Sequence, residues 1–264
     1  MAIEVKNLRF CYGGRPVIGD VSFTAEKGEL LAVLGPNGVG KSTLFRCLLG
    51  FLEPVSGEIL AEGKPLSGYS RRELARKIAY IPQSHTPAFD HTVLDSVLMG
   101  MTAQLGVFEQ PGGLQREKAM QMLRALGLEK LADRGCMKIS GGERQLMLLA
   151  RALVQDASML IMDEPTANLD YGNSCRVMER VQQLGMQGYT IIFSTHDPNQ
   201  AFSYATKVLA LKDGGVMASG APRDVLTEAV LSQLYGIPVA RCEVQTKLGT
   251  KTICMPMPGG EEDN

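Results

Sequence analysis

The sequence lacks the features that mark several common classes of protein. No two of its six cysteines form a C-x-x-C pair, and none clusters with the three histidines, so neither a zinc site nor a disulfide framework is expected. Reduced thiols in the cytosol fit this usage best. No uncharged apolar run approaches the roughly 18 residues that span a bilayer, and the first ten residues contain no signal-peptide apolar region. A role at a membrane would therefore be exercised from the cytoplasmic side through partner proteins.

An excess of charge of one sign is also missing. Lys and Arg total 27 against 28 for Asp and Glu, which gives a formal net charge of -1, so there is no broad electrostatic reason to expect a nucleic-acid partner. The basic stretch Arg71, Arg72, Arg76 and Lys77 is most simply a solvated helix face. With 264 residues, of which 45% are apolar, the chain can form one large α/β domain or two small ones.

The spacing of apolar residues predicts an α/β fold. The first 30 residues alternate apolar and polar side chains on both sides of Gly13-Gly14, which predicts half-exposed antiparallel strands. Four later runs are continuously apolar, as expected for strands buried on both faces of a mostly parallel sheet. These runs are 30–34, 159–162, 191–193 and 208–211.

The remaining segments complete the predicted architecture. The pattern over about 86–158 is helical and predicts an α-helical insertion in the α/β core. Asp213-Gly214-Gly215 predicts the turn of a terminal hairpin, and Arg223 to Tyr235 a last helix. We expect residues 1–257 to form a single domain and the Gly- and acid-rich tail 258–264 to be disordered.

A glycine-rich loop is the strongest chemical signal. Residues Gly35 to Ser42 match G-x-x-x-x-G-K-[ST] and lie between a predicted buried strand and a helical stretch. The glycines allow backbone N–H groups to converge on phosphate oxygens, Lys41 can reach the β and γ phosphates, and Ser42 can ligate magnesium. The alternative is a plain Gly-rich turn.

Two carboxylates follow the apolar run 159–162. Asp163 can hold a magnesium ion, and Glu164 can act on the attacking water as general base or orienting group. The alternative is a strand that ends in a solvated acidic turn.

A third motif, Ser140-Gly141-Gly142-Glu143, precedes an apolar helical run. Ser140 and Glu143 have the spacing of a capping box. Capping does not explain two adjacent glycines, which weaken a helix by about 1 kcal/mol each. A bare backbone at a capped helix N-terminus is suited to an anion, although a purely structural capping box remains the alternative.

Taken in their order along the chain, these motifs resemble those of the ATP-binding subunits of ABC transporters over nearly the whole sequence. Two mild departures are Ile139 for the usual Leu and Glu143 where Gln is commonest. The resemblance implies the ABC ATPase fold, with Mg²⁺ held by Ser42, Gln83 and Asp163 and catalysis by Glu164, His196, Lys41 and Gln83. The residues that it implies for ATP binding are Tyr12, Gly35, Pro36, Asn37, Gly38, Val39, Gly40, Lys41, Ser42, Thr43, Ser140, Gly141, Gly142, Glu143 and Asp170.

Three of these residues have ordinary structural alternatives. Tyr12, beside a Gly-Gly turn, can be a hairpin aromatic that does not stack on adenine. Gln83, after Pro82, can be a polar residue at a strand end, although its carboxamide oxygen could bind magnesium. His196 follows a strand whose end should face the ligand crevice, but an isolated histidine there is often structural.

The resemblance also implies how such a subunit works. Two copies would form a head-to-tail homodimer around ATP and drive two membrane permease subunits from the cytoplasmic face of the inner membrane, with an extracytoplasmic substrate-binding protein as a further partner. Thr86-Pro87-Ala88-Phe89 is a candidate docking surface for a partner helix.

Four stretches of the sequence resemble, more specifically, those of ATPases that serve type II importers for iron-siderophore, haem, cobalamin and related metal-oxyanion substrates. These stretches are 92–100, 167–173, 196–200 and 235–238. An ABC exporter subunit, a soluble ABC ATPase and a P-loop kinase remain alternatives.

Overall fold

The structure is a computed structural model of the chain, and it describes residues 1–83, 89–106, 109–247 and 249–257. The predicted tail 258–264 and most of the candidate docking surface, residues 86–88, lie outside these ranges. The chain divides into two compact units: the first combines Met1–Pro65 with Ile192–Asn264, and the second is Leu66–Ile191.

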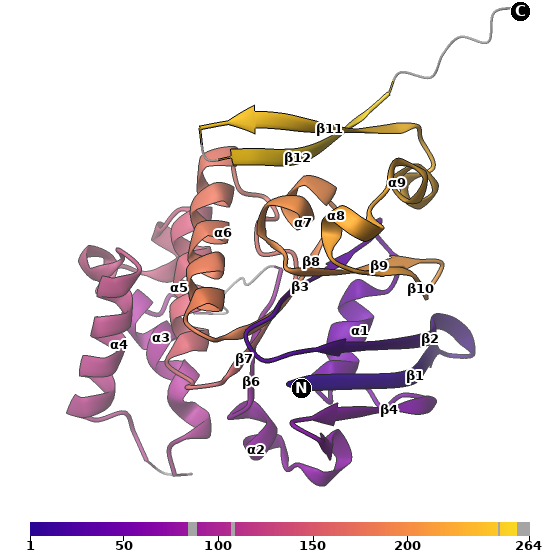
Figure 1. Ribbon diagram of the computed structural model, residues 1–264. Helices are drawn as coiled ribbons and strands as arrows, with labels where there is room; N and C mark the ends of the chain where they lie inside the picture. The colour runs from indigo at the N-terminus through magenta and orange to yellow at the C-terminus, as the bar shows by residue number, and fades with distance from the viewer. Residues whose placement is uncertain (84–88, 107–108, 248, 258–264) are drawn as a thin grey trace, which may run out of the picture. The chain divides into compact units, whose positions relative to one another are not determined.

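The first unit contains the antiparallel sheet predicted at the N-terminus, in the order β2-β1-β4-β5 (Figure 1). Its strands are β1 (Ile3–Tyr12), β2 (Arg15–Ala25), β4 (Ser56–Ala61) and β5 (Lys64–Pro65). Along β1 the apolar Ile3, Val5 and Leu8 are buried, whereas Lys6 is exposed. The alternation therefore predicted β1 and β2 correctly, whereas β4 and β5 lie beyond the 30 residues that showed it.

A second set of strands in the first unit is mostly parallel and has the order β10-β9-β3-β8. The strands are β3 (Leu30–Leu34), β8 (Thr190–Thr195), β9 (Lys207–Lys212) and β10 (Gly215–Gly220). β3 pairs with β9 in parallel, and β10 returns antiparallel along β9, which confirms the predicted terminal hairpin. Every residue of β3 and β8 is buried, as the continuous apolar runs predicted.

The first unit also contains helices. They are α1 (Lys41–Leu48), α7 (Pro198–Tyr204), α8 (Pro222–Val225) and α9 (Glu228–Tyr235). The prediction of one helix over Arg223–Tyr235 is wrong, because the chain forms α8 and α9 separately. Thr227 caps α9 by accepting a hydrogen bond from the Val230 N–H, so its extended backbone interrupts the helix.

A C-terminal hairpin that the sequence analysis did not identify follows α9. Its strands are β11 (Val239–Thr246) and β12 (Gly249–Pro256), which pair antiparallel along their whole length. The hairpin lies beside α7, with β12 against the helix (Figure 1).

The second unit is mainly helical. Its longer elements are α2 (Arg71–Ala75), β6 (Ile78–Ile81), α3 (Val93–Leu98), α4 (Gly113–Ala125), α5 (Gly141–Leu153), β7 (Met159–Met162) and α6 (Tyr171–Met186). Short 3-10 turns cover Leu66–Gly68, Met99–Ala103, Glu129–Leu131 and Cys136–Lys138. β6 and β7 pair in parallel, and α3, α4 and α5 pack on one another within the range predicted to be helical.

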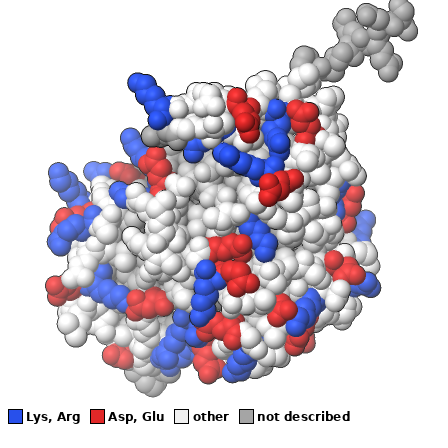
Figure 2. All heavy atoms as spheres, in the orientation of Figure 1, with Lys and Arg blue, Asp and Glu red and all other residues white. Residues whose placement is uncertain are grey.

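The basic stretch around α2 proves to be partly structural. Arg71 and Arg76 are exposed, but the guanidinium groups of Arg72 and Arg76 donate to the Ala103 carbonyl at 2.9 and 3.1 Å. On the face in Figure 2, basic and acidic groups are interspersed among the described residues. Within the part of the chain that the structure describes, no helix has the length and apolar character needed to cross a membrane.

Candidate functional site

The phosphate loop connects β3 to α1 in the first unit, and glycine is required at both of its ends. Gly40, the N-cap of α1, has a φ of 107°, and a Cβ there would lie 2.9 Å from Ile18 Cδ1 and 3.0 Å from the Val17 carbonyl oxygen. A Cβ on Gly35 would lie 2.6 Å from the Leu211 carbonyl oxygen. The loop therefore keeps its shape only with bare backbone at these positions.

Lys41 begins α1 and is held within the loop. Its side chain is buried, and Nζ donates to the carbonyl oxygens of Gly35 at 2.7 Å and Pro36 at 3.2 Å. Ser42, exposed, and Thr43, half-buried, complete the first turn of the helix. The ammonium group and the N-terminal end of α1 are thus brought to one loop, where both favour an anion.

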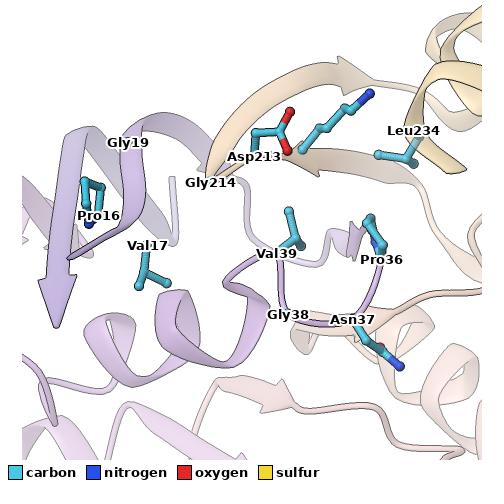
Figure 3. Close-up of a pocket in the computed structure, with 11 residues that line it drawn as sticks. Pro16, Val17, Gly19, Pro36, Asn37, Gly38, Val39, Asp213, Gly214 and Leu234 are labelled. Atoms are coloured by element: carbon cyan, nitrogen blue, oxygen red, sulfur yellow. The ribbon is translucent and has the colours of Figure 1, made fainter. Parts of the chain in front are cut away.

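A cavity of about 490 Å³ lies beside this loop. Four of the predicted ATP-binding residues, Pro36, Asn37, Gly38 and Val39, line it (Figure 3). The opposite wall comes from β2 and from the β9–β10 turn, including Val17 and Asp213. The β9–β10 turn contacts β2 through a hydrogen bond of 2.8 Å from the Gly19 N–H to the Gly214 carbonyl. Because this contact joins residues far apart in the sequence, sequence reasoning missed these wall residues.

Two further predicted residues lie elsewhere in the first unit. Tyr12 ends β1 with 43% of its surface exposed, and its ring meets Phe10 edge-on with centroids 4.8 Å apart. That contact supports the hairpin-aromatic alternative and is also compatible with stacking on a base. His196 directly follows β8, and its side chain is exposed.

The second unit brings together the predicted catalytic carboxylate and the predicted glutamine. The Gln83 side-chain nitrogen donates to Glu164 Oε2 at 3.2 Å, although the two residues are 81 positions apart. Asp163 precedes Glu164 and is buried, with its backbone N–H donating to the Ile81 carbonyl at 2.9 Å. Parallel pairing of β6 with β7 therefore brings all three residues to adjacent strand ends.

Glu164 has a strained backbone. Its φ is 41°, in the left-handed region, which costs a residue other than glycine on the order of 1–3 kcal/mol. Such strain persists where surrounding structure imposes it, and it clusters at active sites. Sequence reasoning had no signal for this conformation.

The Ser140–Glu143 motif forms the capping box that its spacing predicts. The Ser140 N–H donates to Glu143 Oε2 at 2.7 Å, and the Glu143 N–H donates to Ser140 Oγ at 3.3 Å. Gly142 also has a packing role, since a Cβ there would lie 2.7 Å from the Asn173 side chain. Gly141 is exposed, so this part of the α5 N-terminus presents bare backbone at the surface.

Asp170 is the N-cap of α6. Its carboxylate accepts from the Asn173 backbone N–H at 2.8 Å and from Asn173 Nδ2 at 2.7 Å. The backbone hydrogen bond from Asn173 is the main reason that the pKa of Asp170 is lowered from its ordinary value. A structural role is thus established for Asp170, beside the nucleotide role that the resemblance implies.

Comparison with known proteins shows which family the chain belongs to. The ABC transporter family pattern matches residues 18–167. The chain belongs to this family. An uncharacterised ABC transporter ATP-binding protein of Haemophilus influenzae is 41% identical over 235 residues, which cover 89% of each chain. A probable iron chelatin transport ATP-binding protein of Helicobacter pylori is 38% identical over 241 residues, covering 90% of this chain and 94% of the other.

A solved structure gives the same result for the fold. A protein described as an ABC transporter of the metal-chelate type, in an inward-facing conformation, superposes with a TM-score of 0.88 at 36% identity. The match covers 97% of each chain. The predicted ABC ATPase fold is therefore confirmed, and this ABC ATPase has the nucleotide-binding domain whose family couples ATP hydrolysis to transport.

Proposed function

We propose that this ABC ATPase powers an importer for iron-siderophore, haem, cobalamin or related metal complexes. The similarity to an iron chelatin transport ATPase and to a metal-chelate type transporter supports this cargo class. The observation that carries the catalytic part of the proposal is the 3.2 Å contact between Gln83 and Glu164. It joins a residue suited to sensing a metal-bound phosphate with a residue suited to activating water.

The donor set fits a magnesium ion. Ser42 offers a hydroxyl oxygen, Gln83 a carboxamide oxygen and Asp163 a carboxylate oxygen, and Mg²⁺ prefers hard oxygen ligands completed by water and substrate phosphates. When bound, the ion would neutralise charge on the β and γ phosphates. These three residues would hold it in this ABC ATPase.

The remaining roles follow from the chemistry of each side chain. Lys41 and the first turn of α1 bind phosphate oxygens, and the exposed His196 contacts the γ phosphate. Glu164 accepts a proton from the attacking water or orients that water. The Tyr12 ring stacks on the adenine, while Asp170 and the residues Ser140 to Glu143 complete the nucleotide site.

Two copies associate head to tail in this proposal, so that the phosphate loop of each faces Ser140 to Gly142 of the other across ATP. The capped N-terminus of α5 supplies N–H donors and positive potential on the side of the γ phosphate that a single loop leaves open. Loss of the γ phosphate removes these bridging contacts and opens the dimer. Opening and closing then drive two permease subunits at the cytoplasmic face of the inner membrane, with a binding protein delivering the cargo.

Replacement of Glu164 by glutamine tests the proposal. Purified Glu164→Gln should bind ATP with near wild-type affinity and lose at least about 100-fold in turnover, because proton acceptance by a general base contributes about 10²–10⁴-fold. In the native cell, at equal protein level, the variant should abolish uptake of one cargo among labelled ferric siderophores, haem, cobalamin and molybdate.

The two measurements separate the parts of the proposal. Wild-type turnover of Glu164→Gln would contradict the role of Glu164. Loss of turnover without loss of any uptake would contradict the cargo class and favour an exporter subunit. Glu179→Gln, at an exposed position of α6, is the matched control and should leave both turnover and uptake unchanged.

A further inference from the structure

The segment that carries His196 is short and internally tied. His196 is the only residue between the end of β8 and Asp197, the N-cap of α7. The Asp197 N–H donates to Thr195 Oγ1 at 3.0 Å, and Asp197 Oδ1 accepts from the Asn199 N–H at 2.8 Å. The backbone is thus fixed on both sides of His196, and a displacement of α7 would displace the histidine.

Tyr235 reaches this segment from the end of α9. Its hydroxyl donates to the carbonyl oxygen of His196 at 2.9 Å. Burial, followed by electrostatic repulsion from Cys254 once its thiol is ionised and from Asp197, raises the pKa of Tyr235 well above its ordinary value. The hydroxyl therefore keeps its proton and remains a donor throughout the physiological pH range.

Asn199 connects α7 to the C-terminal hairpin. Its Oδ1 accepts from the Cys254 N–H at 2.8 Å, and its Nδ2 donates to the Cys254 carbonyl at 3.1 Å. Thr252 and Cys254 are the buried residues of β12, and β12 packs on α7 (Figure 1). One carboxamide thus satisfies both backbone groups of a single residue 55 positions away.

The residues around the His196 segment are not closely packed on every side. A cavity of about 430 Å³ is lined by His196, Asp197, Asn199, Tyr235 and Cys254, together with neighbouring apolar residues. Because this cavity is open to solvent on one side, hydrogen bonds such as that from Tyr235, rather than close packing, hold the His196 backbone there.

We propose that Tyr235 and Asn199 are positioning residues for ATP hydrolysis, through which α9 and the C-terminal hairpin hold the backbone of His196. Tyr235 acts directly on the His196 carbonyl, and Asn199 acts through α7. The inference rests on the proposed role of His196 at the γ phosphate. It assigns the hairpin a part in the chemical step, in addition to covering α7.

Tyr235→Phe removes only the hydroxyl and is the main test. We expect kcat for ATP hydrolysis to fall about 3- to 10-fold, the effect of one neutral hydrogen bond. KM and the calorimetric Kd for ATP should change less than twofold, because the phosphate loop is unaltered. The melting temperature should stay close to that of the wild type.

Substitutions of Asn199 provide a second test. Asn199→Ala removes both hydrogen bonds to Cys254, and Asn199→Asp keeps the acceptor but places a second oxygen against the Cys254 carbonyl, so kcat should fall in both variants. Gln245→Ala is the control, because Gln245 lies on β11 and accepts from Thr250 within the same hairpin. It should leave kcat unchanged.

A double-mutant cycle decides whether Tyr235 works through the histidine. In a His196→Ala background, Tyr235→Phe should cause no further loss in single-turnover rate. An additional loss equal to that in the wild-type background would overturn the inference, as would a wild-type kcat for Tyr235→Phe. If the wild-type chain itself hydrolyses no ATP, the proposed function fails, whereas wild-type hydrolysis that Tyr235→Phe leaves unchanged defeats only the positioning role.

Discussion

At the scale of single residues, Gly40 is a position of the phosphate loop where an added methyl group should weaken ATP binding. Alanine would have to adopt a φ of 107° with its Cβ 3.0 Å from the Val17 carbonyl oxygen, so the loop must shift away from the phosphate-binding shape. We expect Gly40→Ala to raise the Kd for ATP at least about tenfold, since strain of about 1–3 kcal/mol is released by distorting the loop. Isothermal titration calorimetry measures this change.

Gly38→Ala provides the comparison within the same loop. Gly38 also has a positive φ, of 83°, but no atom lies within 4 Å of the Cβ that alanine would add. It should therefore lose less ATP affinity and less thermal stability than Gly40→Ala. Equal losses in the two variants would contradict the role of the close contact with Val17.

At the scale of elements, the start of α5 depends on one ionised side chain. The Ser140 backbone N–H, and then its hydroxyl, hold the pKa of Glu143 below its ordinary value. A lowered pKa stabilises the fold fully above the unfolded-state pKa of about 4.3, and the contribution disappears as the pH falls through the folded-state value. Glu143→Gln keeps an acceptor oxygen but has no charge to lose.

The prediction is a difference in melting temperature that depends on pH. Wild type should melt above Glu143→Gln at pH 7, and the gap should shrink as the pH falls below about 4. Differential scanning calorimetry of both proteins across this range measures the gap. A gap that stays constant with pH would show that the carboxylate charge does not stabilise the α5 cap.

Elements whose burial follows a simple period could be predicted from the sequence. The alternating residues of β1 and the continuous apolar runs of β3 and β8 gave the correct strands. The single predicted C-terminal helix failed at Thr227, where a side-chain cap starts a new helix. Most of β11 is exposed or half-buried, so its apolar pattern is too weak to indicate a strand.

In the candidate site, too, some features could be predicted from the sequence and others could not. Local motifs indicated the phosphate loop and the α5 cap, because glycine, lysine and capping residues act within a few positions of one another. The bond from Gln83 to Glu164 and the bonds from Asn199 to Cys254 join residues that are 81 and 55 positions apart. Such contacts depend on strand order and hairpin placement, which no local pattern determines.

At the scale of the whole molecule, the predicted nucleotide residues are shared between the two units. The phosphate loop and His196 belong to the first, and Ser140, Asp163 and Glu164 belong to the second. The proposed head-to-tail dimer accounts for the position of Ser140 in the second unit, because the α5 N-terminus of one copy would face the phosphate loop of the other. An obstruction at Ser140 should then prevent dimerisation without affecting the first unit's ATP-binding residues.

Ser140→Arg in a Glu164→Gln background tests this arrangement. With ATP, the Glu164→Gln protein should elute as a dimer in size-exclusion chromatography, whereas the double variant should elute as a monomer that still binds ATP. The arginine would place bulk where the γ phosphate must approach the α5 N-terminus. Gln121→Arg, which adds the same side chain at an exposed position of α4, should leave the dimer intact. If Ser140→Arg still dimerises with ATP, the motif is a capping box alone and the two copies do not meet at α5.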